Sequence, residues 1–412
     1  MMTASIPPWI NENHIIDVLE ENLQGFKSIN KFKSCIAGGA GENYQSVIVR
    51  VQINAELKDG STKDVSFIIK TVPQIEQAAM MLAMMGHFPK ENLMYSKYLP
   101  TFEKMYTEIG QEITFGPKHY TLKKNPESDY VLLDDLCLEG YKNQNRIEGL
   151  DKEHTEAALK KLAEFHAASA VHCQVNGGEL EGPLVNGMFN DQMIGMFVAM
   201  MKPTLEIFLK SLEINEIDSK YIEKARAMID VVMDKFIELN KPNLKDFNVI
   251  CHGDLWSNNI MFLHDEVNGK LKETRFVDFQ LSRYASPVID LYYFLLTSPK
   301  LEIKVANFDE FIQFYHENLI KNLKLLNYSK KLPTLKDLHL DLLKKNFWGF
   351  STLTNTCAGI LLDPSDACNV EDFLKEGDAA DQIKMKLYTN PKYVKQLKVI
   401  LPWMDSRGLL DL

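Results

Sequence analysis

The stretch VICHGDLWSNNIMF, residues 249–262, places a histidine, an aspartate and two asparagines between two short apolar segments. Residues 249–251 and 260–262 are typical of short buried strands. A solvated hairpin would not need such apolar flanks, and a plain core strand would not carry Asp254 in its middle. The stretch therefore predicts either a polar β-turn or a loop that carries catalytic groups between two buried strands.

Two further positions favour the catalytic interpretation. Asn259 follows Asp254 by five residues, and Asp278 lies between apolar strand residues in FVDFQ, nineteen residues beyond Asn259. Phosphoryl transfer needs a carboxylate at the attacking hydroxyl group and oxygen ligands for Mg²⁺. Kinases supply these groups from a loop with an aspartate and an asparagine at this spacing, and from a second aspartate on a separate strand pair. We therefore expect Asp254 to be the catalytic base and Asn259 and Asp278 to be metal ligands.

A glycine-rich segment, AGGAGENYQS, lies between two β-rich runs in the first third of the chain. A loop of this kind can fold over phosphates and offer them backbone N–H groups. Gly39-Ala40-Gly41 gives only the first half of a G-x-G-x-x-G pattern, and no Walker motif occurs anywhere. The segment alone fits a plain hairpin turn equally well. With the catalytic loop downstream, we expect Gly39, Gly41 and Asn43 to contact the nucleotide.

Lys70 ends the strand-like segment VSFIIK, on the face opposite its apolar residues. A lysine at a strand edge is usually solvated. Here it follows a glycine loop by one hairpin, which is the place of the phosphate-contacting lysine of kinases. Such a lysine needs an acidic partner on a following helix. Glu91, in FPKENLMYSKYLP, is the favoured partner because it opens a helix whose apolar side is expected to dock on the sheet; Glu76, in PQIEQAA, is the alternative.

The order of these segments predicts an α+β protein with two lobes, a small β-rich one followed by a larger, mostly helical one. We expect an N-terminal helical extension over residues 1–30, a nucleotide-binding N-lobe over 31–136 and a catalytic and acceptor-binding C-lobe over 137–412. The segment YVLLDDL, residues 130–136, predicts the strand and hinge between the lobes. Backbone groups near Asp134 and Leu136 are expected to face the adenine of ATP, although the acidic pair fits a solvated loop equally well.

Composition limits the possible partners. The 412-residue chain has a formal net charge of −10, which argues against nucleic-acid binding because that needs a basic surface. No apolar run reaches the roughly 18 residues of a membrane-spanning helix, and the N-terminus lacks the pattern of a secretory signal. The six cysteines form no CxxC pair. We expect a cytoplasmic monomer that binds a small-molecule hydroxyl acceptor and neither nucleic acid nor membrane.

Five segments together resemble the ecdysteroid-kinase-like family of insects: CHGDLWSNNIMF, VDFQLSRYASPVIDLYYFL, GGAGENYQS, LLDDL and KLAEFHAAS. That family is a branch of the choline-kinase and aminoglycoside-phosphotransferase group within the protein-kinase-like fold. The resemblance implies transfer of a phosphoryl group, dependent on ATP and Mg²⁺, to a hydroxyl of a small molecule, in the founding case a steroid hormone. By motif it makes Asp254 the base, Asn259 and Asp278 the metal ligands, and Lys70 with Glu91 the phosphate clamp.

The sequence departs from protein kinases in ways that disfavour a polypeptide substrate. Gly253 stands where protein kinases have an arginine, and no Ala-Pro-Glu follows Asp278 to mark an activation segment. Two neighbouring residues have structural interpretations. Asp290 is expected either to cap the helix that follows it or to hold the catalytic loop through the loop's backbone. His252 is expected to be a structural histidine, because Asp254 already fills the role of base.

The acceptor is the least determined feature. Three methionines at helical spacing, Met193, Met196 and Met200, fit either a core helix or the lining of a pocket of steroid size. A choline-type acceptor would instead need an aromatic or acidic cage, with Trp256, Trp348 and Tyr292 as candidates. The alternatives to an ecdysteroid or xenobiotic alcohol kinase are therefore a choline or ethanolamine kinase and a non-catalytic pseudokinase that binds a ligand. A metal-dependent phosphatase is suggested only by the three letters HGD and lacks a second cluster of ligands.

Overall fold

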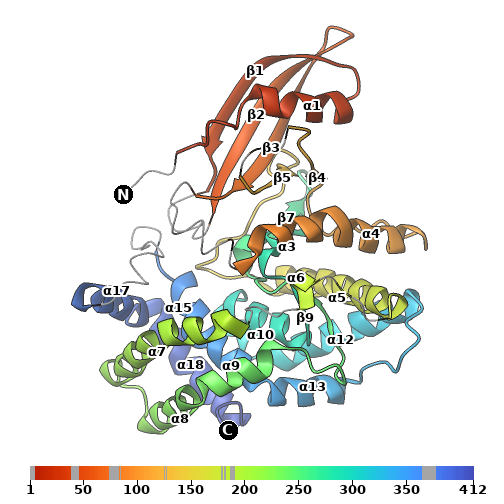
Figure 1. Ribbon diagram of the computed structural model, residues 1–412. Coiled ribbons are helices and arrows are strands. Elements are labelled where there is room, and N and C mark those ends of the chain that lie inside the picture. Colours follow the sequence, from red (N-terminus) through yellow and green to blue (C-terminus); the bar gives the residue numbers. More distant parts are fainter. Residues whose placement is uncertain are drawn as a thin grey trace.

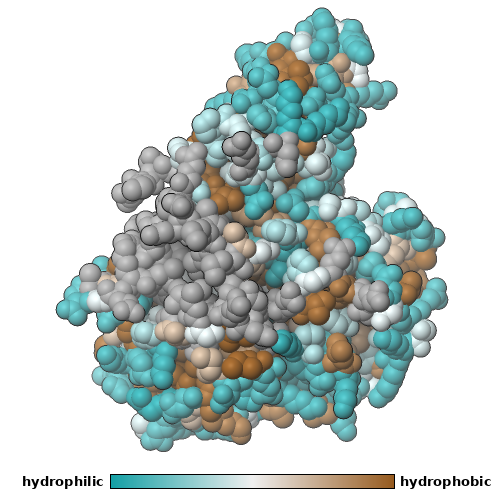
Figure 2. Space-filling model, in the orientation of Figure 1, coloured by the Kyte–Doolittle hydropathy of each residue, from teal (hydrophilic) through white to brown (hydrophobic). Residues whose placement is uncertain are grey.

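The computed structural model of the protein describes residues 5–38, 46–73, 83, 85–124, 126, 128–177, 180, 182–185, 191–363 and 377–412. The chain forms an upper lobe around an antiparallel sheet and a lower lobe of helices (Figure 1). Hydrophilic residues cover most of the upper lobe on the face shown in Figure 2. The two-lobed α+β architecture expected from the sequence is confirmed.

The sheet of the upper lobe has the strand order β1-β2-β3-β5-β4, and all neighbours are antiparallel. Its strands are β1 (Phe26–Ile36), β2 (Val47–Leu57), β3 (Thr62–Thr71), β4 (His119–Tyr120) and β5 (Tyr130–Asp134). Helix α1 (Glu12–Asn22) begins at the capping residue Asn11 and packs its apolar side on one face of this sheet. The helix expected as a separate extension is therefore part of the upper-lobe core, and β1 begins before residue 31.

Strand β3 separates two environments by the alternation of its side chains. Phe67 and Ile69 are buried in the core that the sheet shares with α1. Lys70 lies between Ile48 of β2 and Val131 of β5 in the hydrogen-bonded ladder, and its side chain contacts groups outside that core. The position of Lys70 relative to the apolar residues of its strand is the one expected from the sequence.

A nearly continuous helical segment lies between β3 and β4 in the chain. It consists of α3 (His87–Leu93), a π-helical turn η1 (Met94–Tyr98) and α4 (Leu99–Thr107). Met94, Tyr98 and Leu99 are buried, but in the core shared with the lower lobe rather than in the core under α1. That core also contains Val131 and Leu133 of β5, and α3 contacts β5 while η1 contacts β4, so the segment docks on the sheet as expected, on the face opposite α1. It also packs on the lower lobe, where α4 contacts α5 (Lys152–Val175).

The lower lobe is organised around the packed pair α5 and α12 (Phe308–Leu325). The other described helices are α6 (Gly182–Val185), α7 (Asp191–Ile214), α8 (Ser219–Asp230), α9 (Val232–Asn240), α10 (Val288–Thr297), α11 (Leu301–Lys304), α13 (Leu335–Lys344), α14 (Asn346–Ser351), the π-helical turn η4 (Thr352–Thr356), α15 (Cys357–Ile360), α17 (Asp378–Tyr388) and α18 (Pro391–Ser406). Among the described helices, none combines the length and the apolar character needed to span a bilayer.

Two small antiparallel strand pairs interrupt the helices of the lower lobe. Strand β6 (Val249–Cys251) pairs with β9 (Arg283–Ala285), and β7 (Ile260–His264) pairs with β8 (Leu271–Phe276). The loop between β6 and β7 and the loop between β8 and β9 therefore emerge side by side. These two loops carry Asp254 and Asp278, which the chain separates by more than twenty residues.

Candidate active site

The loop between β6 and β7 is closed by the side chain of Asn259. Its amide Nδ2 donates to the backbone oxygen of Asp254 at 2.8 Å and to Asp254 Oδ2 at 3.0 Å. Asn259 ends a short 3₁₀ turn, η2 (Ser257–Asn259), and β7 begins at the next residue. The five-residue spacing between the aspartate and the asparagine is thus the span of one compact loop.

Gly253 is required by the backbone of this loop. Its φ is +85°, and a Cβ atom built at this position would lie 2.2 Å from the backbone oxygen of Leu281. A side chain would therefore be strained by the backbone conformation and would also collide with the neighbouring loop. Glycine at this position, which distinguishes the chain from protein kinases, lets the β6–β7 loop pack directly on the loop that follows Asp278.

Asp290 holds the β6–β7 loop, the predicted catalytic loop, through the backbone of that loop. Its Oδ2 accepts from the N–H of His252 at 2.7 Å, and its Oδ1 accepts from the N–H of Gly253 at 2.8 Å. The N-cap of α10 is Pro287, with no side-chain capping bond. Of the two roles expected for Asp290, the structure shows the one in which it braces the loop.

His252 is a structural residue, as expected. It is fully buried, its Nε2 lies 3.0 Å from the carbonyl oxygen of Val277, and its Nδ1 accepts from the N–H of Asp254 at 3.3 Å. These two contacts specify the neutral tautomer with the proton on Nε2. Burial lowers the pKa of His252, which also favours the neutral ring.

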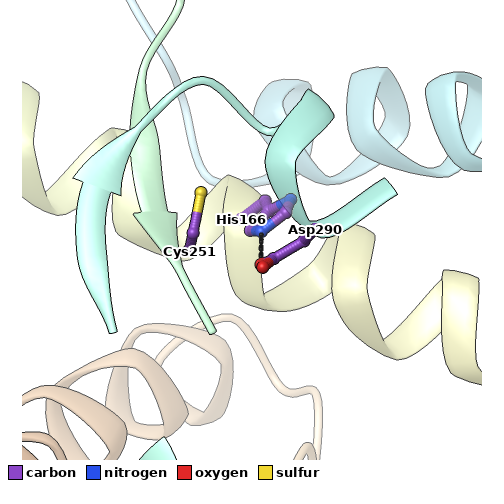
Figure 3. Close-up of side chains that lie close together, drawn as sticks. All are labelled: His166, Cys251 and Asp290. Carbon is purple, nitrogen blue, oxygen red and sulfur yellow. Dashed lines mark hydrogen bonds and ion pairs between the residues drawn. The ribbon is translucent and has the colours of Figure 1, made fainter. Parts of the chain in front are cut away.

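His166 of α5 supports Asp290 from behind (Figure 3). Its Nε2 lies 3.0 Å from Asp290 Oδ2, and its Nδ1 lies 2.7 Å from the hydroxyl of Tyr315 on α12. Burial opposes the charge of Asp290, but the hydrogen bonds from His166 and Gly253 hold the pKa of Asp290 below its usual value. The central helix pair of the lower lobe is thereby connected to the catalytic loop.

The same figure shows that Cys251 lies beside His166 and Asp290, and the possible ligand atoms of the three residues lie within 4.8 Å of one another. Both oxygens of Asp290 and both ring nitrogens of His166 are already hydrogen-bonded. The Cys251 thiol donates to the carbonyl oxygen of Ser286 at 3.3 Å. The cluster is therefore a hydrogen-bonded brace and not a metal centre.

Lys70 joins the two lobes at the site. Its Nζ lies 2.8 Å from Glu91 Oε2 on α3 and 2.6 Å from Asp278 Oδ1 in the lower lobe, and it donates to Gln280 Oε1 at 3.1 Å. Asp278 follows β8 with a φ of 67°, an uncommon conformation for a residue other than glycine and one that recurs at functional sites. Between the two candidate partners from the sequence, Glu91 is the one that pairs with Lys70 among the described residues.

Burial sets the electrostatics of this cluster. Burial and the charge of Asp278 raise the pKa of Asp254 to about 7, against the hydrogen bonds from Tyr293 and Asn259. Burial also raises the pKa of Glu91 to about 7, although Lys70 opposes this shift. The two carboxylates raise the pKa of Lys70 above its usual value despite burial. The charge of Asp278 therefore raises the pKa of both Asp254 and Lys70, so the three groups are electrostatically coupled.

A comparison with models of known protein families shows which family the chain belongs to. The model described as "Ecdysteroid kinase-like family" matches residues 40–328, well over half of the chain. The chain belongs to the ecdysteroid kinase-like family. Family membership, together with the catalytic loop, indicates a kinase that acts on a small molecule.

Two other similarities are more distant. Phosphoglycerate kinase of Thermosipho africanus (strain TCF52B) is 28% identical over 138 residues, which cover 30% of this chain and 32% of that enzyme. The matched part is thus about a third of the length of that relative. A structure described as amicoumacin kinase hAmiN in complex with AMP-PNP, Ca²⁺ and Ami aligns over 92% of this chain and 93% of its own, with a TM-score of 0.42 and 12% identity.

The hinge of this ecdysteroid kinase-like protein is more ordered than a solvated loop. Asp135 is buried and accepts from Arg50 Nε at 2.6 Å, from Ser66 Oγ at 2.7 Å and from the N–H of Cys137 at 3.1 Å. The N–H of Asp134 donates to the carbonyl oxygen of Lys118. The contacts of Asp134 and Leu136 with the adenine of ATP remain a prediction.

Two residues at the site were not expected from the sequence. Tyr293 donates a hydrogen bond from its hydroxyl to Asp254 Oδ1, and Gln280 links Lys70 to the Asp278 loop. Tyr293 lies three residues after Asp290 on α10, so helical spacing places both on the side that faces the loop. This three-residue spacing from Asp290 is the feature of the sequence from which the position of Tyr293 could have been predicted. The predicted nucleotide contacts Gly39, Gly41 and Asn43, and the alternative partner Glu76, lie outside the described residues.

Proposed function

We propose that the protein transfers the γ-phosphoryl group of ATP to a hydroxyl group of a small hydrophobic molecule, an ecdysteroid or a related alcohol, with Asp254 as the base. The observation that carries this proposal is the position of Lys70, which reaches from the sheet to pair with both Glu91 and Asp278. In kinases the lysine that contacts the ATP phosphates pairs with a glutamate on a helix, and a nearby aspartate holds Mg²⁺. We assign these two roles to Glu91 and Asp278.

Asn259 and Asp278 have the donor atoms that suit Mg²⁺. The amide nitrogen of Asn259 is used by Asp254, which leaves the amide oxygen as its ligand atom. The side chain of Asp278 is 26% exposed, unlike those of Lys70 and Glu91. Hard oxygen donors of this kind are the preferred ligands of Mg²⁺. When bound, the ion would neutralise charge that develops on the phosphate oxygens.

Asp254 has the environment of a general base. A pKa of about 7 leaves a useful fraction of carboxylate at neutral pH and makes it basic enough to accept the proton of an alcohol. Asn259 and Tyr293 hold one carboxylate oxygen each and fix its orientation. As the acceptor oxygen forms its bond to the γ-phosphorus, its proton passes to Asp254, and the bond from phosphorus to the leaving oxygen of ADP breaks.

The residues considered for a choline cage do not favour a cationic acceptor. Tyr292 is fully buried, and its hydroxyl donates to the carbonyl oxygen of Leu342 at 2.7 Å. The ring of Trp348 is occupied by the guanidinium of Arg283, whose carbon lies 4.6 Å from the ring centroid. A pseudokinase is disfavoured by the presence of Lys70, Asp254, Asn259 and Asp278 in one connected site. The side chains of Met193, Met196 and Met200 lie outside the description.

The decisive experiment compares the wild type with Asp254→Asn, using γ-labelled ATP, Mg²⁺ and a panel of steroids, phenolic glycosides and amino alcohols, with the product identified by mass. We expect the variant to lose roughly 10²- to 10⁴-fold in turnover, because a positioned base contributes about that much, and to keep its nucleotide affinity. Asp265→Asn, in the exposed β7–β8 turn, is the matched control and should retain turnover. Turnover of Asp254→Asn at the wild-type rate would refute the assignment.

A further inference from the structure

Three basic side chains beside the proposed active site are buried. His87 and Lys90 lie on α3, the helix that carries Glu91, and Arg283 is the first residue of β9. Their exposed fractions are 1%, 3% and 3%. Helix α3 packs on the short 3₁₀ turn η3 (Phe279–Leu281), which leads directly into β9. The three side chains therefore belong to one junction, between α3 and the loop that carries Asp278.

Polar atoms of two of these side chains, His87 and Arg283, lack acceptors. Both ring nitrogens of His87, and Nε and Nη1 of Arg283, are buried without a hydrogen-bond partner. Within the described parts of the chain, no carboxylate forms an ion pair with Lys90 or Arg283. Asp290 acts on Arg283 electrostatically, but both of its oxygens already accept hydrogen bonds from the catalytic loop and His166. Trp348, which stacks on Arg283, also has a buried indole N–H without a partner.

These groups are close enough to disfavour one another's charge. Burial and the charge of Arg283 lower the pKa of Lys90 to about 8. Burial, Lys90 and Lys70 lower the pKa of His87 to about 4. Arg283 cannot become neutral in this way, because a guanidinium does not lose its proton in proteins. A buried unpaired charge costs several kcal/mol, so a cluster of this kind is expected to have an anionic counterpart.

We propose that His87, Lys90 and Arg283 form a binding site for an oxyanion group, a carboxylate, phosphate or sulfate, beside the reaction centre. The planar fork of an arginine matches the paired oxygens of such groups, and a lysine adds a point charge. Arg283 also lies near Tyr293, the donor to Asp254, so the cluster lies close to the proposed base. This step rests on the proposed function, under which the anionic group is part of the acceptor molecule. Free inorganic phosphate is the other source of the anion.

The first experiment measures anion binding to the full chain without nucleotide. Inorganic phosphate and sulfate are titrated against the melting temperature, with sodium chloride at equal ionic strength as the reference. We expect phosphate and sulfate to raise the melting temperature in a saturable way, because a ligand that binds only the folded state stabilises it. A response no greater than that of chloride would overturn the proposal.

The variants Arg283→Gln and Lys90→Gln locate the site. Each should weaken phosphate binding by about tenfold or more, since each removes a charge-assisted contact. In the absence of anion, Arg283→Gln should be at least as stable as the wild type, because an unpaired buried charge has been removed. The matched control is Arg407→Gln: Arg407 also stacks on a tryptophan, Trp403, at 5.2 Å, but it pairs with Asp309. Undiminished phosphate binding in both cluster variants would refute the site.

A further variant and a ligand pair separate the possible sources. Lys70→Ala should keep its response to phosphate, which would exclude the phosphate clamp as the place of binding. Cholate, a hydroxysteroid with a carboxylate, should displace phosphate, whereas its uncharged methyl ester should not; this result assigns the anion to the acceptor. If neither cholate nor its methyl ester displaces phosphate, free phosphate is the ligand. If the methyl ester displaces phosphate as well as cholate does, the assignment of the anion to the acceptor is overturned. Because no step uses ATP, these results stand apart from the test of Asp254.

Discussion

Tyr293 on α10 donates its hydroxyl hydrogen bond to Asp254 Oδ1, while Asn259 donates to Asp254 Oδ2 at 3.0 Å. Each oxygen of the carboxylate is therefore held by a different element. The same helix supplies Asp290, which binds the backbone of the loop one turn away. Helix α10 thus fixes both the path of the catalytic loop and the orientation of its carboxylate, and substitutions on this helix are expected to act on turnover.

Tyr293→Phe removes the bond to Asp254 and leaves the ring in place. We expect turnover to fall by about tenfold, because the carboxylate loses one of the two contacts that orient it, with little change in the KM for ATP. Tyr292→Phe is the matched control. Its hydroxyl donates to the carbonyl oxygen of Leu342, away from Asp254, so this variant should lose about 1 kcal/mol of stability and keep its turnover. Equal turnover in the two variants would show that Tyr293 does not position the base.

Gly253→Ala tests the close contact between the two loops of the site. The new methyl group would lie 2.2 Å from the backbone oxygen of Leu281, and the backbone has a positive φ. We expect a loss of more than about 2 kcal/mol in the free energy of unfolding and nearly complete loss of turnover. Gly269→Ala has a similar φ, +68°, but nothing lies within 4 Å of the new atom. Denaturant unfolding of both should show that this control loses only about 1 kcal/mol; a similar loss in both would exclude the contact as the cause.

Lys70→Met and Glu91→Gln test separately how much the cation and the carboxylate of the ion-pair cluster contribute to stability. Lys70→Met leaves Glu91 buried without its cation, whereas Glu91→Gln leaves Lys70 paired with Asp278. We therefore expect Lys70→Met to be the more destabilising of the two, by about 1–3 kcal/mol at neutral pH, and the double variant to recover part of that loss. Thermal unfolding of the four proteins in the cycle gives the coupling. Strictly additive effects would mean that the pair contributes no coupling energy.

The sequence predicts those parts of the fold and site that depend on local spacing. Asp254 and Asn259 fall within one loop, so their relation follows from a five-residue interval and the apolar strands beside it. The two faces of β3 follow from strand alternation, which assigns Lys70 to the side opposite Phe67. The division into a sheet lobe and a helical lobe follows in the same way from the order of the segments, because apolar residues alternate in the strand-like segments and recur every three to four residues in the helical ones.

Relations that depend on packing between distant segments could not be predicted in this way. The apolar residues of α3 and η1 fit either the sheet or the lower lobe in sequence, and in the structure they lie in one core that contains residues of both β5 and α5. Asp135 looks like a solvated residue in sequence, but Arg50 from β2 neutralises it in the hinge. The role of Tyr293 depends on the approach of α10 to a loop almost forty residues earlier, which no local interval specifies.

Asp290→Asn tests the brace behind the catalytic loop and predicts a pH dependence. An asparagine would place an NH₂ group against backbone N–H donors, so we expect a loss of about 3 kcal/mol at pH 7 and a lower turnover. Because its neighbours hold the pKa of Asp290 below the ordinary aspartate value, the charged group stabilises the fold above about pH 4 and loses this contribution as the pH falls through its folded-state pKa. The difference in stability between the wild type and Asp290→Asn should therefore shrink on acidification from pH 5 towards pH 3. Unfolding measured across this range checks the prediction, with Asp378→Asn in the exposed first turn of α17 as the control for an aspartate replaced outside the brace. A difference that stays constant down to pH 3 would show that the charge of Asp290 does not stabilise the loop.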